Sequence, residues 1–334
     1  MKNRVSSAGG FSLIELMIAL VVMGVVTSQL FVVFANQKKV FTSNDRALDV
    51  QETSRLTLDL VAFDTRMAGF MVPPYTAVAS VDGGTDHADR LCVSAPSSGG
   101  AGPVVQNRIA RFDGATVRTI VSGAPPSITV DTLDFDLDLT WDFVQNSGII
   151  VASATKSYCA RILTVTNVGG VNTITFAVPN TEDPAAFLGA VTADMRAVPA
   201  NVYELDEGLL ELRRNNLLLG TQVEDFQVEY WLDNAGLPNG VEDGDTEFPV
   251  NDLNNPDPPG GGIPAENDLV RRVRVSVMAR TIRTDLNDSA TGHLLGGRPA
   301  LANRNAAAAA DGFRRRSFSA SILPRNIIQL QAPS

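Results

Sequence analysis

The sequence predicts an α+β protein in which one long N-terminal helix packs on an antiparallel β-sheet domain. Two observations predict this class. The first 70 residues contain an apolar run and then apolar residues at every third or fourth position, which is the helical period. Beyond about residue 130, apolar residues recur at every second position, which is the period of a strand. One helix followed by many strands favours an α+β arrangement with the sheet packed on the helix.

The chain begins with a short basic segment, residues 1–10, which ends in Gly9-Gly10. Lys2 and Arg4 are its only charged side chains, so the positive-inside rule keeps this end in the cytoplasm. Residues 11–35 are almost entirely apolar. A run of about 20 apolar residues can cross a hydrocarbon core of roughly 30 Å as a helix. We therefore expect residues 11–35 to span a membrane and the rest of the chain to lie on its far side.

Glu15 is the charged side chain near the start of this run. A carboxylate buried in hydrocarbon costs on the order of 2.5–3.5 kcal/mol at mid-membrane depth. Glu15 therefore needs either a cationic partner or a position at the membrane interface.

Gly10, Phe11 and Glu15, within Gly-Phe-Ser-Leu-Ile-Glu-Leu, resemble the type IV prepilin signature. In that family a prepilin peptidase cleaves after the glycine and methylates the new N-terminus, which here is Phe11. The family's glutamate pairs with the N-terminal amine of a neighbouring subunit during filament assembly, which would give Glu15 its cation. The resemblance thus implies a type IV pilin-like fold, a leader peptide at residues 1–10 and an assembly role for Glu15.

Two other interpretations of the N-terminus remain open. A secretory signal has an apolar region of about 7–15 residues and a small-residue cleavage site, and Val33-Phe34-Ala35 could serve as that site. The apolar run is longer than this, and Glu15 has no purpose in such a signal. Alternatively, the protein is permanently anchored and Glu15 reaches the cytoplasmic interface.

Residues 36–70 are expected to continue the helix as an amphipathic segment outside the membrane. Five large apolar residues recur at helical spacing on one face: Leu56, Leu60, Phe63, Met67 and Phe70. We expect this face to pack under the protein's own sheet. The helix should end near Met67, before Pro73-Pro74, which cannot continue it.

The β-rich domain, residues 71–334, contains several strand candidates. In residues 131–143, leucine, phenylalanine and tryptophan alternate with aspartate, which is typical of a half-buried strand. Further candidates rich in branched and aromatic residues are residues 157–165, 171–178, 203–205, 209–213, 223–232, 270–282 and 317–327. Asp206-Glu207-Gly208 indicates a hairpin turn.

The two cysteines, Cys92 and Cys159, both lie on the expected exported side. An oxidising compartment favours their pairing, and closing this loop would stabilise the fold by roughly 4 kcal/mol in the chain-entropy model. Two free buried thiols are the alternative.

Charge and composition disfavour several functions. The formal net charge of -10 argues against direct binding of nucleic acid through broad electrostatic attraction. Residues 233–268 hold many carboxylates, which suit calcium, but the spacing of an EF-hand is absent. We expect a solvated loop there and neither an obligatory metal nor a cofactor.

Evidence for catalysis is weak. The two histidines, His87 and His293, lie in loop-like surroundings, and the sequence has no metalloprotease, nucleophile-elbow or P-loop motif. We therefore expect a protein that is not an enzyme.

Segments of the C-terminal half resemble the PilW-type minor pilins. They are residues 223–230, the acidic loop, residues 269–284, Arg314-Arg315-Arg316-Ser317-Phe318 and Pro324-Arg325-Asn326. This resemblance implies a minor pilin in the priming or tip complex of a type IV pilus, which supports adhesion, twitching motility or DNA uptake. Its implied partners are other minor and major pilins, the prepilin peptidase and the inner-membrane assembly platform. It also implies a single-pass inner-membrane location, with the C-terminal domain in the periplasm until incorporation into the pilus.

Two alternatives stay open. One is a minor pseudopilin of a type II secretion system. The other is a membrane-anchored periplasmic enzyme or binding protein that never enters a filament.

Overall fold

A computed structural model describes residues 12–69, 72, 76–81, 83, 86–95, 114–131, 143–153, 156–169, 171–177, 188–232, 270–281, 298–302, 304–307 and 313–324. The chain divides into two compact units, Met1–Asp49 and Val50–Ser334. One helix, α1 (Leu13–Met67), contributes to both units.

The helix α1 is long because its sequence contains no proline and only one glycine, Gly24. It ends at Met67, as predicted. Gly69 follows with a φ of 79°, the left-handed conformation that commonly terminates helices and that glycine adopts without strain. The Gly69 backbone N–H then donates to the Ser94 hydroxyl at 3.0 Å, which ties the end of the helix to a strand.

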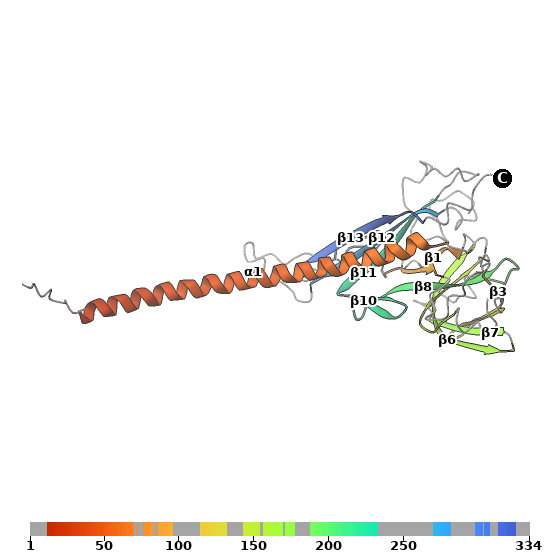
Figure 1. The fold of residues 1–334 in the computed structure, drawn as a ribbon, viewed down its shortest axis with the longest axis horizontal. Helices are drawn as coiled ribbons and strands as arrows, with labels where there is room; N and C mark the ends of the chain where they lie inside the picture. Colours follow the sequence, from red (N-terminus) through yellow and green to blue (C-terminus); the bar gives the residue numbers. More distant parts are fainter. Residues whose placement is uncertain are drawn as a thin grey trace, which may run out of the picture. The chain divides into compact units, whose positions relative to one another are not determined.

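The larger sheet contains strands β1 to β10 and is entirely antiparallel (Figure 1). Its strands are β1 (Val78–Val81), β2 (Arg90–Ser94), β3 (Ala115–Val121), β4 (Ser127–Asp131), β5 (Gly148–Ala152), β6 (Ser157–Val168), β7 (Val171–Ala177), β8 (Arg196–Asp206), β9 (Glu211–Arg214) and β10 (Leu217–Thr221).

Part of this sheet closes on itself. The strands β3, β4, β7, β6, β5 and β8 pair in this order, and β8 pairs again with β3. Alternate side chains of these strands point inward and form one buried cluster, which includes Val117, Ile128, Ile149, Ile162 and Phe176. The closed ring is therefore a small antiparallel barrel filled by its own hydrophobic core.

The strand β8 belongs to two structures at once. Residues near its start pair with β5 and β3 in the barrel, whereas its second half pairs with β2 and β9. The order β1-β2-β8-β9-β10 thus makes an open sheet that continues from the barrel wall.

A second sheet has the order β11-β12-β13, formed by β11 (Val223–Leu232), β12 (Val270–Arg280) and β13 (Arg315–Ile322). Its inner face joins the open part of the first sheet and the C-terminal half of α1 in one core, which includes Leu58, Val61, Tyr203, Phe226 and Val275. The structure confirms the predicted α+β class, with the helix packed on antiparallel sheets.

Several strand predictions are confirmed and others lie outside the described residues. The strands β6, β7, β11 and β12 match the predicted segments closely, and β8 and β9 meet at the predicted turn, where the Asp206 carboxylate accepts from the backbone N–H groups of Gly208 and Leu209. Of the candidate strand at residues 131–143, residues 132–142 lie outside the described part of the chain. The end of the 317–327 candidate, beyond residue 324, does so too.

The predicted buried face of the helix was wrong. Leu56, Phe63 and Met67 are exposed by 64%, 61% and 49%, and Leu60 is half-buried, while Phe70 lies outside the described residues. The buried face is instead the opposite one, formed by Val50, Ser54, Thr57, Leu58, Val61, Ala62, Asp64, Thr65 and Ala68. These side chains are mostly small, which lets the helix lie close to the sheets. For example, a Cβ atom on Gly220 of β10 would come within 2.9 Å of the Thr53 methyl group.

Candidate functional site: the N-terminal helix and its attachment

The first turn of α1 presents Glu15. The Ser12 carbonyl accepts from the backbone N–H groups of Glu15 at 3.0 Å and Leu16 at 3.2 Å, which starts the helix. An acidic side chain in the first turn is favoured by the helix dipole. The predicted cleavage and methylation positions, Gly10 and Phe11, lie outside the described residues.

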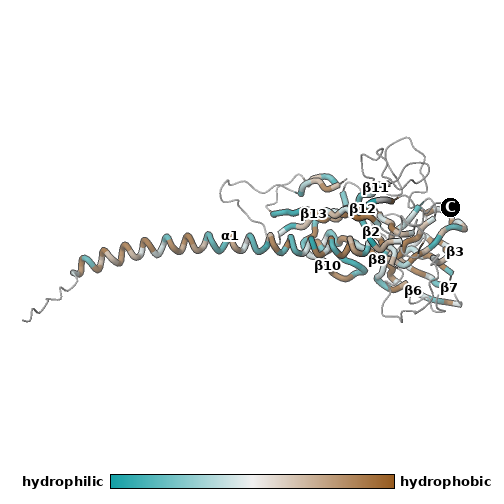
Figure 2. Tube along the Cα trace, turned by 45° about the horizontal axis from the view of Figure 1, so that its top comes forward, coloured by the Kyte–Doolittle hydropathy of each residue, from teal (hydrophilic) through white to brown (hydrophobic). Residues whose placement is uncertain are grey.

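The segment after Glu15 is apolar on every side. All side chains from Ser12 to Phe41 are exposed, and the large ones include Leu20 at 65%, Phe31 at 72% and Phe34 at 64%. The apolar stretch is visible as brown tube in Figure 2. A helix that is hydrophobic all round is typical of a membrane span or of the centre of a helical assembly. By length and composition, α1 is able to cross a membrane, with a mean hydropathy of 2.5 in its most apolar window.

Glu15 is the one charged side chain between Ser12 and Ala35. Among the described residues, no salt bridge to its carboxylate is present. A carboxylate in such surroundings is stable only if another molecule brings a cation or if it stays at the interface.

The C-terminal half of α1 is attached to the sheets through Asp64, a residue that the sequence analysis had not placed in the buried face. Its Oδ2 atom accepts from Tyr203 Oη at 2.6 Å, Asn201 Nδ2 at 2.8 Å and Arg214 Nε at 2.8 Å. Asp64 itself is 8% exposed. Burial, reinforced by the Asp64 charge, raises the pKa of Tyr203 above its usual value. Burial lowers the pKa of Arg214, but Tyr203 and Asp64 outweigh it and the net shift is upward.

The recurrence of small residues at helical spacing could have indicated this face from the sequence. Ser54, Thr57, Val61, Thr65 and Ala68 follow one another at intervals of three or four. The prediction of the buried face relied on the large apolar residues of the helix and not on this pattern of small residues. Close packing depends on shape as much as on hydrophobicity.

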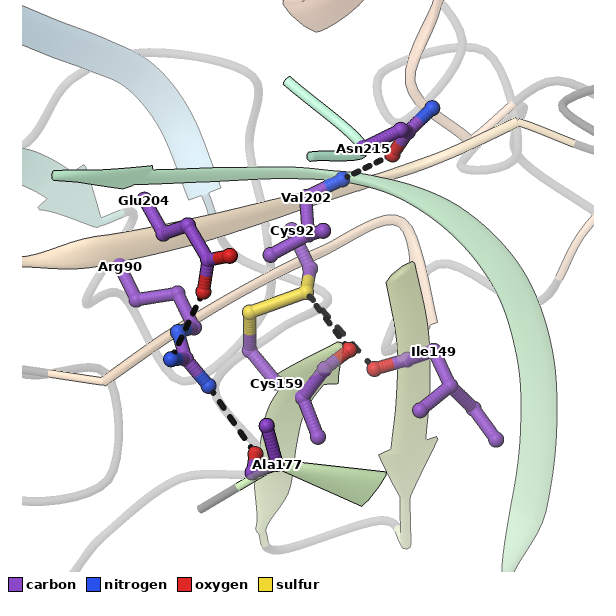
Figure 3. Close-up of a disulfide and its surroundings, with 9 residues drawn as sticks. Arg90, Cys92, Ile149, Cys159, Ala177, Val202, Glu204 and Asn215 are labelled. Atoms are coloured by element: carbon purple, nitrogen blue, oxygen red, sulfur yellow. Dashed lines mark hydrogen bonds and ion pairs between the residues drawn. A yellow bond between two sulfur atoms is a disulfide. The ribbon is translucent and has the colours of Figure 1, made fainter. Parts of the chain in front are cut away.

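Cys92 of β2 and Cys159 of β6 form a disulfide with a Cα–Cα distance of 5.5 Å, the pair that the sequence analysis favoured (Figure 3). Both residues are fully buried in a cluster of mostly small side chains. Because β6 belongs to the barrel and β2 does not, the bond joins the barrel wall to the open sheet.

An ion triad lies near the disulfide. The Glu204 carboxylate contacts Arg90 Nη2 at 2.9 Å, and Arg90 also donates to the Ala177 carbonyl at 3.2 Å (Figure 3). Glu204 also contacts Arg161 Nε at 2.5 Å. Burial lowers the pKa of Arg90, and the Glu204 charge opposes this shift. Charges paired in this way within the fold have the character of a structural contact.

The described residues contain no group of three or more acidic, histidine or cysteine side chains that could hold a metal ion. The acidic residues 233–268 and His293 lie outside the described part of the chain. The expectation that residues 233–268 form a solvated loop without an obligatory metal therefore stays a prediction. His87 is half-exposed and contacts Glu207 at 3.3 Å.

Comparison with known proteins identifies the N-terminal segment. Residues 6–28 match the family model of the prokaryotic N-terminal methylation motif. Among solved structures, a type IV-like pilin from Thermus thermophilus is similar at 17% sequence identity and a TM-score of 0.22, over 55% of this chain and 85% of that chain. No curated protein sequence matches significantly.

The matched motif thus lies at the start of a chain in which one long helix, apolar in its first part, is followed by antiparallel sheets, the arrangement of a type IV pilin-like fold. The single apolar helix and the motif also fit anchoring in the inner membrane.

Proposed function

We propose that this protein is a minor pilin that takes part in the assembly of a type IV pilus, within a priming or tip complex. The observation that carries the proposal is the position of Glu15. It is the one carboxylate between Ser12 and Ala35, where the side chains of α1 are exposed on all sides, and it lies inside the matched methylation motif. Such a helix suits two apolar environments in turn. A pilin helix lies first in the lipid bilayer and then among the helices of other subunits in the filament.

The proposed mechanism is assembly without turnover. The leader, residues 1–10, keeps the N-terminus in the cytoplasm until prepilin peptidase cleaves after Gly10 and methylates Phe11. Glu15 then pairs with the terminal amine of a neighbouring pilin, since that cation removes the cost of placing its charge among apolar side chains. The β-rich domain selects partners outside the membrane. The protein would thus be a structural subunit and not an enzyme.

The disulfide supports a periplasmic location for residues 71–334. Disulfides persist in oxidising compartments and are rare in the cytosol. Cys92 and Cys159 are paired and buried, on the side of the helix that would be exported.

The PilW-type assignment is part of the same proposal and rests on the sequence resemblance of the C-terminal half. The phenotype of a deletion strain distinguishes a minor pilin from a minor pseudopilin of a type II secretion system. Loss of surface pili with normal secretion supports the minor pilin, whereas lost secretion with normal piliation would assign the protein to a secretion pseudopilin.

The first test is the N-terminal mass of the protein purified from its native membranes. We expect a chain that begins at methylated Phe11. A chain that begins at Met1 or near Asn36 would contradict the proposal and favour a permanent anchor or a secretory signal.

The second test is Glu15→Ala, compared with Glu52→Ala as a matched control. Both carboxylates are exposed on α1, but Glu52 lies beyond the apolar run. We expect Glu15→Ala to leave processing largely intact and to lower the number of surface pili, while Glu52→Ala leaves piliation near the wild-type level. Normal piliation in Glu15→Ala would remove the proposed role of this residue.

A further inference from the structure

The outer edges of the sheets differ in how they are protected. An exposed strand edge presents unpaired N–H and C=O groups, and proteins usually shorten, bulge or cap such edges. The edge strand β1 has only 4 residues. The strand β10 contains a bulge between Leu218 and Gly220.

The outer edge of β11 is capped by a side chain and by one backbone contact. Asp89 Oδ2 accepts from the Val228 N–H at 2.7 Å, and the Asp89 N–H donates to the Phe226 carbonyl at 2.9 Å. This edge is therefore occupied by the loop that precedes β2.

In the part of the chain that the structure describes, the strand β13 has none of these devices. It is 8 residues long and pairs with β12 in an unbroken register from Arg280↔Arg315 to Val273↔Ile322. Within the described residues, no strand pairs with its other edge. From Ser317 to Ile322 the sequence contains no proline and no charged residue. These six residues form a regular edge of the kind that accepts an additional strand.

The side chains of β13 define what kind of strand would fit. Ser317, Ser319 and Ser321 are exposed and point to one face, while Phe318, Ala320 and Ile322 pack toward the core shared with α1. Figures 1 and 2 both show β13 beside the helix, and the Arg55 guanidinium lies 5.9 Å from the centre of the Phe318 ring. The neighbouring Leu56 is 64% exposed. A strand added beside β13 would place its apolar side chains on the helix side and its small polar side chains on the serine side.

We propose that the free edge of β13 binds an extended strand from another subunit of the assembly, in which apolar and small polar residues alternate and an acidic residue lies opposite Arg316. The identity of the partner rests on the function proposed above. Backbone hydrogen bonds along Ser317–Ile322 supply the affinity, and contacts with Phe318 and the exposed flank of α1 supply the specificity.

Charge argues against a second copy of this chain paired in parallel register as the partner. Arg316 is exposed at the beginning of β13. Two copies paired in parallel and in register would bring their Arg316 side chains next to each other, and directly adjacent like charges destabilise strand pairing. An acidic residue of a different subunit fits this position better.

The test measures hydrogen exchange of the full-length protein, in detergent micelles and in filaments sheared from cells. Solvent deuterium is the probe. We expect alternate amides from Ser317 to Ile322 to exchange rapidly in the isolated protein and roughly tenfold or more slowly in the filaments. Amides in the central strand β12 serve as the internal control and should be protected in both samples.

Unchanged exchange in the filaments would overturn the proposal. So would protection in the isolated protein that disappears when residues 325–334 are removed, because the protein's own C-terminal segment would then occupy the edge. Protection of the isolated protein that depends on its concentration would assign the edge to a second copy and would also overturn it.

Two proline variants give an independent test. The N–H groups of neighbouring residues point to opposite edges of a strand. Of the two variants Ser319→Pro and Ala320→Pro, one therefore removes a hydrogen bond to β12. The other, called the outward variant, removes an N–H group that points away from β12. We expect the outward variant to keep the wild-type melting temperature and to be depleted from filaments at least tenfold. Ser319→Ala, which leaves the edge backbone intact, should assemble normally. An outward proline variant that assembles like the wild type would refute the edge proposal, and Glu15→Ala would still test the proposed function separately.

Discussion

In residues 13–35 of α1 the large apolar side chains are exposed on all sides, whereas in residues 50–67 the buried face carries mainly small and polar side chains. The side chains of the first half are suited to an apolar environment supplied by other molecules. The second half is fixed to the sheets by close approach and by the Asp64 hydrogen bonds. The difference teaches that most large hydrophobic residues of this helix are exposed, whereas the face that packs on the sheets is mainly small and polar, with Leu58 as a buried exception.

The strongest test of this comparison is Asp64→Ala. The substitution leaves Tyr203 Oη and the Arg214 guanidinium without their shared acceptor, and breaking a buried charge pair from one side costs about 3–5 kcal/mol. We expect a loss of this size in the free energy of unfolding, measured by denaturant titration of the full chain in detergent. Asp59→Ala, an exposed carboxylate on the same helix, should change it by less than about 0.5 kcal/mol.

A leucine pair sharpens the comparison further. Leu58 is 6% exposed and Leu56 is 64% exposed, two residues apart on one helix. Leu58→Ala should lower the free energy of unfolding by about 2–4 kcal/mol because it leaves a cavity in the core. Leu56→Ala should have almost no effect on unfolding. Equal losses for the two variants would mean that the helix packs in another rotation.

A pH titration tests the attachment of the second half in another way. The pKa of Tyr203 is raised, so above pH 10 the folded protein keeps a proton that the unfolded chain releases. The stability that this group contributes should therefore be constant below pH 10 and should fall as the pH rises above it. Tyr203→Phe is expected to lose stability at neutral pH, where the hydrogen bond to Asp64 is missing, but to show a shallower alkaline decline. Denaturant midpoints at pH 8 and pH 11 measure both effects, and parallel declines would contradict the assignment.

The smallest effect is expected in the first half of the helix. Leu20 is 65% exposed, so Leu20→Ala should leave the unfolding of the β-rich domain unchanged to within about 0.5 kcal/mol. A clear loss of domain stability in detergent would show that this half also packs against the protein itself.

The elements predicted correctly are those with a regular period. β6, β7, β11 and β12 contain alternating or branched apolar residues with clear turns between them. The long helix was predicted by its apolar run and by the lack of proline. The α+β class followed from these signals alone.

The missed strands lack such a period for physical reasons. β5, Gly-Ile-Ile-Val-Ala, is buried along its whole length and so does not alternate. β8 contains Pro199, which normally argues against a central strand. In this structure Pro199 lies between the residues that pair with β3 and those that pair with β2, and its carbonyl accepts from the Ala95 N–H. Barrel closure depends on pairings between distant strands, which no local pattern contains.

Glu15 was singled out because a charge in an apolar run is conspicuous in the sequence, and its role in assembly stays a prediction. The pairing of Cys92 with Cys159 followed from the expected compartment. Asp64 was missed, since its three partners are 137 to 150 residues away in the chain. A charged residue on an amphipathic helix is usually solvated, and only the fold brings its partners to it.

The strands β3 to β7 lie in the sequence between β2 and β8, which are adjacent strands of the open sheet. The chain leaves this sheet at Ser94, the end of β2, and Ser94 lies opposite Ala200 of β8, where the chain returns. The chain can therefore be read as a helix-binding scaffold with a barrel inserted between two adjacent strands. Such an insertion is free to change in length, loops or surface chemistry during evolution, while the open sheet and the second sheet continue to pack on the helix. Related subunits could then share one way of entering an assembly and display different barrels on it.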